Sequence, residues 1–465
     1  MTYDLIIIGA GPAGMSAAIT AASLGLRTLL LDEQAHLGGQ IYRNVAKASG
    51  KMNAILGPDY AYGRQIVAEL EMASVDLRLS STAWDITPGF CVRALQDGNA
   101  LQFRAPQLIV ASGALERPSP MPGWTLPGVL NAGAAQIAMK SGASIPCGQI
   151  VLAGGGPLLL LVACQLLDAG AKVAGIVETS PAANIGQAVP CLLGAIRSPK
   201  LLAKGLAMTT RLKKAGIAWH RGADGLHVEG EDKAEALSFN AGGRRHRLEA
   251  DTVLLHHGVI PNTQISRLLR ADHDWNAAQL AWQPRLDVFR ETSVTGLRIA
   301  GDGGGIGGAR AAEASGRLAA LGAAHALGRL DDSERDRLSA PERRKLAAQM
   351  RIRPFLDALY RPPKWLNAPK GETIVCRCEE VTAGEIRNSV ALGSRGPNQT
   401  KFYSRCGMGP CQGRICGPTV TQILADELSI SPSEVGAYQV RSPLKPITLQ
   451  QMASLREVPK EKGTA

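Results

Sequence analysis

Residues 3–14 read YDLIIIGAGPAG, and this stretch decides the fold. Residues 3–8 form a mostly apolar run that predicts a buried strand, and the glycine turn behind it leads into an alanine-rich helix at residues 15–23. A strand, a G-x-G-x-x-G turn and a helix in this order are typical of a dinucleotide-binding unit, in which the helix N-terminus faces the phosphates. The stretch therefore predicts an α/β domain that begins here.

The glycines of this turn and the acidic pair that follows it are the first candidate ligands. Gly9 permits a tight turn, Gly11 lets a pyrophosphate approach the backbone, and Gly14 lets the helix pack on the strand. Asp32 and Glu33 come directly after the second apolar strand. A carboxylate at this place accepts hydrogen bonds from the adenosine ribose, and either residue could supply it.

Two later segments favour FAD over NAD. Residues 108–114 read LIVASGA and resemble the Ala-Thr-Gly segment of flavoproteins with two dinucleotide domains. Residues 297–302 read LRIAGD and resemble the late strand of that family, which ends in Gly-Asp. The resemblance implies that Gly113, Gly301 and Asp302 lie at the flavin, with Asp302 beside its ribityl or phosphate part. Without the resemblance, Asp302 is a turn or helix-cap residue.

A second strand, turn and helix pattern occurs at residues 149–159, which read QIVLAGGGPLL. Leu159 stands where the third glycine would press the helix on the strand, and Pro157 suits only the first helical turn. The segment resembles the NAD(P)H domain of a flavoreductase whose nucleotide site is altered. Glu178 ends the strand that follows, so NAD(P) binding stays open.

Five of the nine cysteines lie within 41 residues near the end of the chain. Cys376 and Cys378 form a C-x-C pair, and Cys411 and Cys416 form a C-x4-C pair, with 32 residues between the two pairs. Four such thiolates complete the ligation of a two-iron cluster, whereas a C-x-C pair fits the usual zinc spacing poorly. Cys406 is also separated from Cys411 by four residues, so spacing alone does not choose between Cys406 and Cys416.

The sequence around these cysteines resembles the BFD-like domain that binds a 2Fe-2S cluster. The likeness rests on CRCEEVT at residues 376–382 and GMGPCQGR at residues 407–414. In that family the final cysteine pair encloses Gln-Gly. The resemblance therefore implies a ligand set of Cys376, Cys378, Cys411 and Cys416.

Composition agrees with a large oxidoreductase of two or three domains, with 465 residues, 45% of them apolar, and 52 glycines. No apolar run reaches the length of a membrane span, and the sequence opens into a strand without a signal peptide, so we expect a cytoplasmic protein. The net charge of +11 is spread along the chain without a stacking array of aromatic residues. We interpret it as solvated surface that partly faces an acidic partner protein, not nucleic acid.

Some catalytic groups are missing. Residues 38–43 read GGQIYR and lack the cysteine pair that flavoprotein disulfide reductases need beside the flavin. The remaining cysteines are interpreted as small apolar residues; they are Cys91, Cys147, Cys164 and Cys191. His256 and His257 end a strand before GVIPN at residues 258–262, and we expect a structural role for them, with proton transfer near the flavin as the alternative.

Taken whole, the chain resembles the larger, FAD and cluster carrying subunit of opine oxidases, D-hydroxyproline dehydrogenase and hydrogen cyanide synthase. The likeness covers essentially all 465 residues. Its most specific parts are GGQIYR, then GALERP at residues 113–118 with PGWTLPGV at residues 122–129, and the cysteine domain. The resemblance implies that Gly39 and Gln40 also lie at the flavin.

The implied fold is an α/β flavoprotein with two glutathione-reductase-like dinucleotide domains and a small C-terminal BFD-like domain. Its expected parts are an FAD domain at 1–120 and 255–330, a degenerate second dinucleotide domain at 121–254, a helical arm and Pro-rich linker at 331–370, the BFD-like domain at 371–430, and a tail at 431–465. We expect the tail to be loosely ordered from Pro443 onward.

The resemblance also implies a division of labour. A partner flavoprotein of the D-amino-acid-oxidase type would oxidise an amine or imino acid, and this chain would pass the electrons through FAD and the 2Fe-2S cluster to a downstream acceptor. The family also allows an FMN at a subunit interface and, as a further partner, a small ferredoxin-like subunit. The alternatives are a self-sufficient NAD(P)H-dependent flavoreductase and an iron sensor or store.

Overall fold

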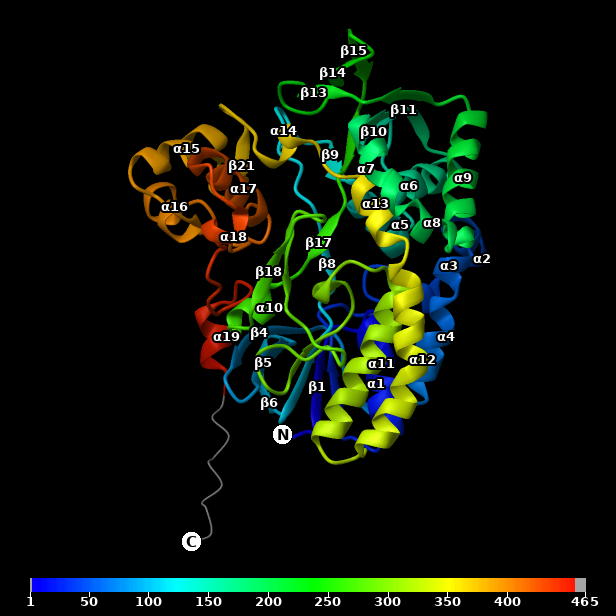
Figure 1. Cartoon of the computed structure of the whole chain (residues 1–465), viewed down its shortest axis with the longest axis vertical. Helices are drawn as coiled ribbons and strands as arrows, with labels where there is room; N and C mark the ends of the chain where they lie inside the picture. The colour runs from blue at the N-terminus through cyan, green and yellow to red at the C-terminus, as the bar shows by residue number, and fades with distance from the viewer. Residues whose placement is uncertain (1, 456–465) are drawn as a thin grey trace.

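Two parallel sheets, each flanked by helices, form the main body of the computed structural model, which describes residues 2–455 (Figure 1). The first sheet has the order β20-β7-β1-β2-β3, with every neighbouring pair parallel. Its strands are β1 (Leu5–Ile8), β2 (Thr28–Leu31), β3 (Val75–Arg78), β7 (Gln107–Val110) and β20 (Leu297–Ile299). Because β20 pairs with β7, this sheet joins the beginning of the chain to a segment almost 300 residues away.

The second sheet is also parallel and has the order β12-β11-β10-β16-β9. Its strands are β9 (Val129–Asn131), β10 (Gln149–Gly154), β11 (Lys172–Glu178), β12 (Ala218–Arg221) and β16 (Thr252–His256). An antiparallel sheet lies at its end and consists of β13 (Asp224–Glu229), β14 (Ala236–Ala241) and β15 (Arg244–Glu249). We call the first sheet with its helices the first body, and the second sheet with its helices and the antiparallel sheet the second body. The chain passes between the two bodies where β8 (Ala114–Glu116) pairs with β17 (Val259–Pro261).

Two helices, α1 (Pro12–Ser23) and α11 (Ala309–Ala326), cover one face of the first sheet, and a third, α12 (Asp332–Met350), packs on α11 (Figure 1). Small residues bring α1 and α11 unusually close, since a Cβ on Gly316 would lie 2.0 Å from the carbonyl oxygen of Ala13. Asp331 caps α12 by accepting a hydrogen bond from the amide of Glu334 at 2.8 Å. Within residues 2–455, no helix is both long and apolar enough to cross a membrane.

The cysteine-bearing C-terminal domain has a small core of its own. It contains β21 (Ile374–Cys376), β22 (Val381–Thr382), α15 (Ala383–Ala391), α16 (Pro397–Ser404) and α17 (Gly417–Leu428). Trp124 of the second body fastens it, because its indole N–H donates to the carbonyl of Ile374 at 2.7 Å. The Arg377 guanidinium lies over the same ring, 5.3 Å from its centroid.

The segment after this domain differs from the loosely ordered tail that we expected from Pro443 onward. Val440 and Leu444 are buried in a core shared with the first body. The amide of Leu444 donates to the carbonyl of Trp84 at 2.6 Å, and a further helix, α19 (Leu449–Ala453), contacts β6 (Asn99–Arg104). The prolines suggested disorder, but the burial of Val440 just before them and of Leu444 among them orders this segment. Residues 456–465 of the expected tail lie outside the described residues.

The four cysteines outside the C-terminal domain are free and divide by burial. Cys91 and Cys164 are buried, as expected for small apolar residues, whereas Cys191 is half-buried. Cys147 is exposed, so the expectation of an apolar interior role does not hold there.

The close crossing of α1 and α11 gives a test of the fold. We expect Gly316→Ala to lower the thermal unfolding midpoint by roughly 2–10 °C, because the added methyl meets backbone that cannot yield easily. Gly205→Ala, in the middle of the exposed helix α9 (Pro199–Lys214), meets nothing within 4 Å and serves as the matched control. Its midpoint should stay unchanged or rise, since alanine is the better helix former. Equal midpoints for the two variants would contradict the packing described here.

Candidate flavin and iron-sulfur sites

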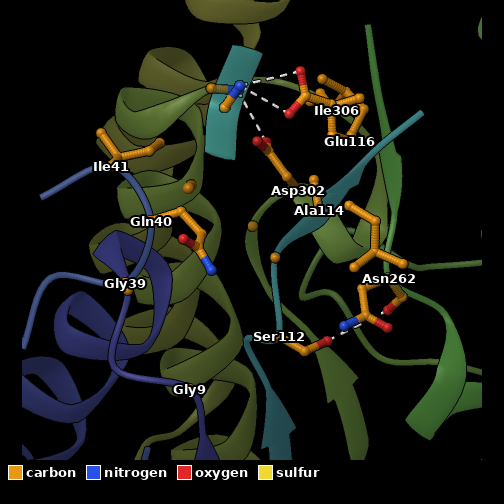
Figure 2. A pocket seen from close by; sticks show the side chains of 18 of the residues that line it. Gly9, Gly39, Gln40, Ile41, Ser112, Ala114, Glu116, Asn262, Asp302 and Ile306 are labelled. Carbon is orange, nitrogen blue, oxygen red and sulfur yellow. Dashed lines mark hydrogen bonds between the residues drawn. The ribbon is translucent and has the colours of Figure 1, made fainter. Parts of the chain in front are cut away.

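A cavity of about 800 Å³ opens at the carboxyl ends of β1 and β2 and extends toward the second body. Figure 2 shows its centre, with Gln40 on one wall and Asp302 and Glu116 on the opposite wall. The structure brings nine of the ten predicted flavin ligands to this cavity. They are Gly9, Gly11, Asp32, Glu33, Gly39, Gln40, Gly113, Gly301 and Asp302.

The glycine turn forms a floor of bare backbone. A Cβ on Gly9 would lie 2.5 Å from the carbonyl oxygen of Ala111, and one on Gly39 would lie 2.7 Å from Cα of Gly11. Gly14 does not line the cavity, and its Cβ would lie 1.7 Å from the carbonyl oxygen of Gly9. Gly14 therefore serves helix packing alone, while the other glycines leave the space and the helix N-terminus that a pyrophosphate requires.

The two carboxylates after β2 have different surroundings. Asp32 is buried and accepts hydrogen bonds from the amides of Ala10 at 2.5 Å and Gln34 at 2.7 Å. Burial raises the pKa of Asp32, and these amide hydrogen bonds oppose the rise. Glu33 is exposed at the cavity rim and forms an ion pair with Lys445. Both carboxylates line the cavity, so both stay candidate ribose ligands.

Asp302 organises the turn before α11. Its Oδ1 accepts hydrogen bonds from the amides of Gly307 and Gly308, both at 2.9 Å. Both glycines and Asp302 line the cavity, so the carboxylate holds a glycine-rich wall in place beside the predicted flavin position. A backbone of this kind can approach a flat ring closely.

Glu116 and His256 form a buried pair that the sequence did not reveal. His256 Nδ1 lies 2.6 Å from Glu116 Oε1, and Glu116 Oε2 accepts from the amide of Gly133 at 2.9 Å. His256 Nε2 points toward Gly156, whose Cβ would lie 3.7 Å away, and all of these residues line the cavity. Glu116 belongs to the quoted GALERP stretch, which was the available signal.

His257 is of a different kind. Its Nδ1 lies 2.7 Å from Ser119 Oγ, and burial, with His256 and Arg117 nearby, lowers the pKa of His257 to about 3. The ring is therefore neutral near pH 7. This fits the structural role that we expected for it.

Three segments complete the cavity wall without any advance signal in the sequence. The helix α13 (Arg353–Leu359) and the residues after it contribute Arg353, Leu356, Asp357 and Tyr360. The C-terminal segment contributes Leu444 and Lys445, and the cysteine domain contributes Arg414. All of them come from distant parts of the chain that only the tertiary fold brings together.

Lys140 lies buried beneath the Gly39-Gln40 wall. Its Nζ donates to the carbonyl of Gln40 at 3.0 Å and to Gln136 Oε1 at 2.8 Å. Burial, followed by the nearby Arg43, lowers the pKa of Lys140 from 10.5 to about 7. The lysine therefore fixes the backbone of a predicted flavin contact and titrates near neutral pH.

The cysteines converge on one site. The Sγ atoms of Cys376, Cys406 and Cys416 lie within 4.8 Å of one another, and all three residues are buried. Cys378 hydrogen-bonds to Cys411, which in turn hydrogen-bonds to Cys416. Hydrogen bonds among these sulfurs lower the pKa of Cys376 to about 2 and raise that of Cys416, as expected for thiols that crowd together. The four predicted ligands are thus together, with Cys406 as a fifth sulfur among them.

The loop that carries two of the predicted ligands also reaches the flavin cavity. Arg414 lies between Cys411 and Cys416 in the sequence and lines the cavity. In the same loop, Gln412 donates a hydrogen bond to the carbonyl of Pro443, next to the segment that closes the cavity. One loop therefore connects the cysteine site with the cavity that holds the predicted flavin ligands.

The second glycine turn carries the two residues that the sequence singled out. Pro157 is the first residue of α6 (Pro157–Asp168), and Leu159 is fully buried behind the turn. Glu178 does not line the cavity, and its carboxylate accepts from Trp219 at 3.1 Å and pairs with Arg221 at 3.7 Å. The acidic group that would receive a nicotinamide nucleotide's ribose is already engaged.

Comparisons with known proteins agree with this geometry. The pyridine nucleotide-disulphide oxidoreductase family matches residues 3–316, and the BFD-like [2Fe-2S] binding domain matches residues 374–426. The A subunit of opine oxidase from Agrobacterium tumefaciens (strain Ach5) is 42% identical over 97% of this chain and 92% of its own length. The chain belongs to the opine oxidase A-subunit family.

Two further proteins are similar to this chain, one in sequence and one in fold. Hydrogen cyanide synthase subunit HcnB of Pseudomonas protegens is 34% identical over 96% of this chain and 97% of its own length. The crystal structure of L-proline dehydrogenase from P. horikoshii has a TM-score of 0.72 at 19% identity, covering 98% of this chain and 80% of that one, which shows the fold alone.

Membership in the opine oxidase A-subunit family makes the chain a flavoprotein oxidoreductase with a BFD-like [2Fe-2S] domain. The predicted fold class and the predicted classes of cofactor, FAD and a 2Fe-2S cluster, are thereby confirmed. The individual ligands, a second flavin and NAD(P) stay predictions.

Serine substitutions test the cysteine ligands. We expect Cys376→Ser, Cys378→Ser, Cys411→Ser and Cys416→Ser each to lose most of the bound iron, sulfide and visible cluster absorption, because a two-iron cluster needs four thiolates. Cys406→Ser should keep them, as should the exposed control Cys147→Ser. If Cys416→Ser kept its iron and cluster absorption while Cys406→Ser lost them, Cys406 would be the fourth ligand in place of Cys416.

Lys140 gives a pH prediction. The unfolded chain binds more protons than the folded chain between the folded pKa of about 7 and the unfolded value of 10.5, so stability should rise with pH in this window. One proton contributes at most about 1.4 kcal/mol per pH unit. Thermal melts at pH 7, 8 and 9 should show a smaller rise for Lys140→Met than for the wild type or the exposed control Lys51→Met. Parallel profiles for all three proteins would refute the buried titration.

Proposed function

We propose that this chain is the electron-transfer subunit of a multi-subunit oxidase, in which a partner flavoprotein oxidises an amine or imino acid. The observation that carries the proposal is Arg414, which lies between two predicted cluster ligands and lines the flavin cavity. A single chain thus holds a flavin site and a cluster site on either side of one loop. That arrangement suits electron passage between them.

The relatives support the coarser part of the proposal. Opine oxidase and hydrogen cyanide synthase are named as complexes in which the similar protein is one subunit, and the alpha subunit of sarcosine oxidase from Rhizobium meliloti is 24% identical over 96% of this chain. Their names refer to an opine oxidase, a sarcosine oxidase and a synthase of hydrogen cyanide. We propose a small amine or imino acid as the substrate here, held by the partner.

The chain's own residues would bind and enclose the cofactor. The glycine floor of Gly9, Gly11 and Gly39 leaves room for the pyrophosphate, while Asp302 and Lys140 fix the two walls through backbone contacts. FAD would supply the conversion between two-electron and one-electron transfer. Since a cluster would accept electrons without protons, residues of this chain would also have to take up protons beside the flavin.

His256 is the group best placed to handle such a proton. Glu116 holds Nδ1 of this ring at 2.6 Å, which leaves Nε2 on the side of Gly156 and the cavity. A carboxylate at one ring nitrogen orients the other for proton exchange. We therefore assign His256 a proton-transfer role, which was the alternative to the structural role expected from its sequence context.

One observation favours the alternative of an NAD(P)H-dependent flavoreductase. Gly155 and Gly156 of the second glycine turn line the same cavity as the flavin residues. Against it, Leu159 replaces the third glycine and Glu178 is engaged by Trp219 and Arg221. We rank the electron-transfer function first for this reason.

A spectroscopic test separates the two functions. The protein is purified without oxygen, analysed for flavin, iron and sulfide, and its absorption is recorded before and after NADH or NADPH. We expect one FAD and two irons per chain, with no bleaching within minutes, because Leu159 replaces the third glycine and Glu178 is already engaged. Stepwise reduction by dithionite should then reduce both the flavin and the cluster. In Cys376→Ser, only the absorption change of the flavin should remain.

Other results would overturn parts of the proposal. Rapid bleaching by NADH would make the chain a reductase in its own right. Oxidation of opines, proline derivatives or glycine by the isolated chain would remove the need for a partner. If a reduced flavin did not pass electrons to the cluster, the proposed electron path through the loop that carries Arg414 would be wrong.

A further inference from the structure

Exposed apolar side chains of the described residues are concentrated on the second body. Seven of the seventeen exposed large hydrophobic side chains of residues 2–455 fall within a stretch of 22 residues. We call them the α7–α9 patch; they are Ile185, Val189, Leu192, Leu193, Ile196, Leu201 and Leu206. Five of them are between 56% and 74% exposed. Single exposed apolar residues are common on protein surfaces, but a group of them marks an interaction site. Such a patch indicates a surface that is normally covered.

The patch is built on consecutive short helices. They are α7 (Ala183–Ala188), η2 (Val189–Cys191) and α8 (Leu192–Ile196), followed by α9. Ile185, Val189, Leu192 and Ile196 follow one another at spacings of four, three and four residues. This spacing places apolar side chains along one side of a helical segment and is the pattern that fits a groove on another protein.

The inner side of the same segment is fastened to the wall of the flavin cavity. Asn184 is buried and donates to the carbonyls of Leu359 at 3.2 Å and Arg361 at 2.9 Å, both at the end of α13. A Cβ on Gly194 would lie 2.7 Å from the carbonyl oxygen of Arg351, just before α13. Since α13 contributes Arg353 and Asp357 to the cavity wall, the patch is separated from the cavity by this one helix (Figure 1).

The surroundings of the patch are strongly basic. Residues 183–214 carry six lysines and arginines and no acidic residue, in a chain whose net charge is +11. Lys204 pairs with Asp59 and Arg211 with Asp168. The other four form no ion pair with any described residue; they are Arg197, Lys200, Lys213 and Lys214. A surface of this kind is complementary to an acidic one.

From these observations we infer that the α7–α9 patch is the docking surface for the amine-oxidising partner, whose contacting face is apolar with acidic residues around it. The inference rests on the proposed function and gives it a location. A partner seated here would lie next to α13, close to where its electrons must enter the flavin cavity. A second copy of this chain fits less well, because it would oppose the same unpaired cations to one another.

The test uses the full chain, tagged and expressed in its native host, and purified with the proteins that accompany it. We expect a flavoprotein partner in fixed stoichiometry by native mass spectrometry, and protection of residues 185–206 from hydrogen exchange in the complex. Leu193→Asp with Ile196→Asp should weaken the complex at least about tenfold, since central apolar contacts dominate such interfaces. FAD and iron content should remain at wild-type levels, which shows that the chain is folded.

Met72→Asp is the matched control, because Met72 is 89% exposed and lies outside the patch. It should retain the partner fully. If the patch variant also retains the partner, or if protection falls elsewhere, the docking site is wrong and the proposed function stands. If the wild type carries no stoichiometric flavoprotein, the proposed function itself fails. Binding of the wild type, but not of the patch variant, to phosphatidylglycerol vesicles would assign the patch to a membrane surface and overturn the inference.

Discussion

Contact of backbone with backbone, without side chains between, is the constraint on which this structure depends. Gly14 packs against the carbonyl of Gly9, and Gly316 packs against that of Ala13. Helix α1 therefore lies so close to the first strand and to α11 that a Cβ atom would not fit at either glycine. The glycines of the turn between β1 and α1 also leave backbone exposed to the cavity at Gly9 and Gly11. The space for a dinucleotide and the tight packing of the helices that border it thus have one cause.

A second consequence concerns how the two redox sites are joined. The cysteine domain has its own core, yet it is not tethered loosely, because Trp124 and Arg377 hold it on the second body and Gln412 holds it on the C-terminal segment. Its loop then supplies Arg414 to the flavin cavity. For the electron transfer proposed above, these contacts would keep the cysteine site at a fixed distance from the cavity.

The fold could be predicted from local sequence patterns because the strand, glycine turn and helix of a dinucleotide unit lie within about 30 residues. The glycine turn at Gly9, the Gly-Asp at residues 301–302 and the cysteine pairs all have spacings that chemistry restricts. The rest of the cavity could not be predicted in this way. Tyr360 and Lys445 carry no local signature, and Glu116 meets His256 only after β16 takes its place in the second sheet. The tail was misjudged for the same reason, since its prolines are local and the core that receives Leu444 is not.

The closing of the cavity by Leu444 and Lys445 has a consequence for biosynthesis. The wall of the cavity draws on residues from Ile8 to Lys445, so the ribosome must release nearly the entire polypeptide before the pocket is enclosed. The nascent FAD domain is left open on the side where this last segment will lie. The pocket therefore takes its final form only after synthesis has passed Lys445 and the C-terminal segment has folded back onto the first sheet.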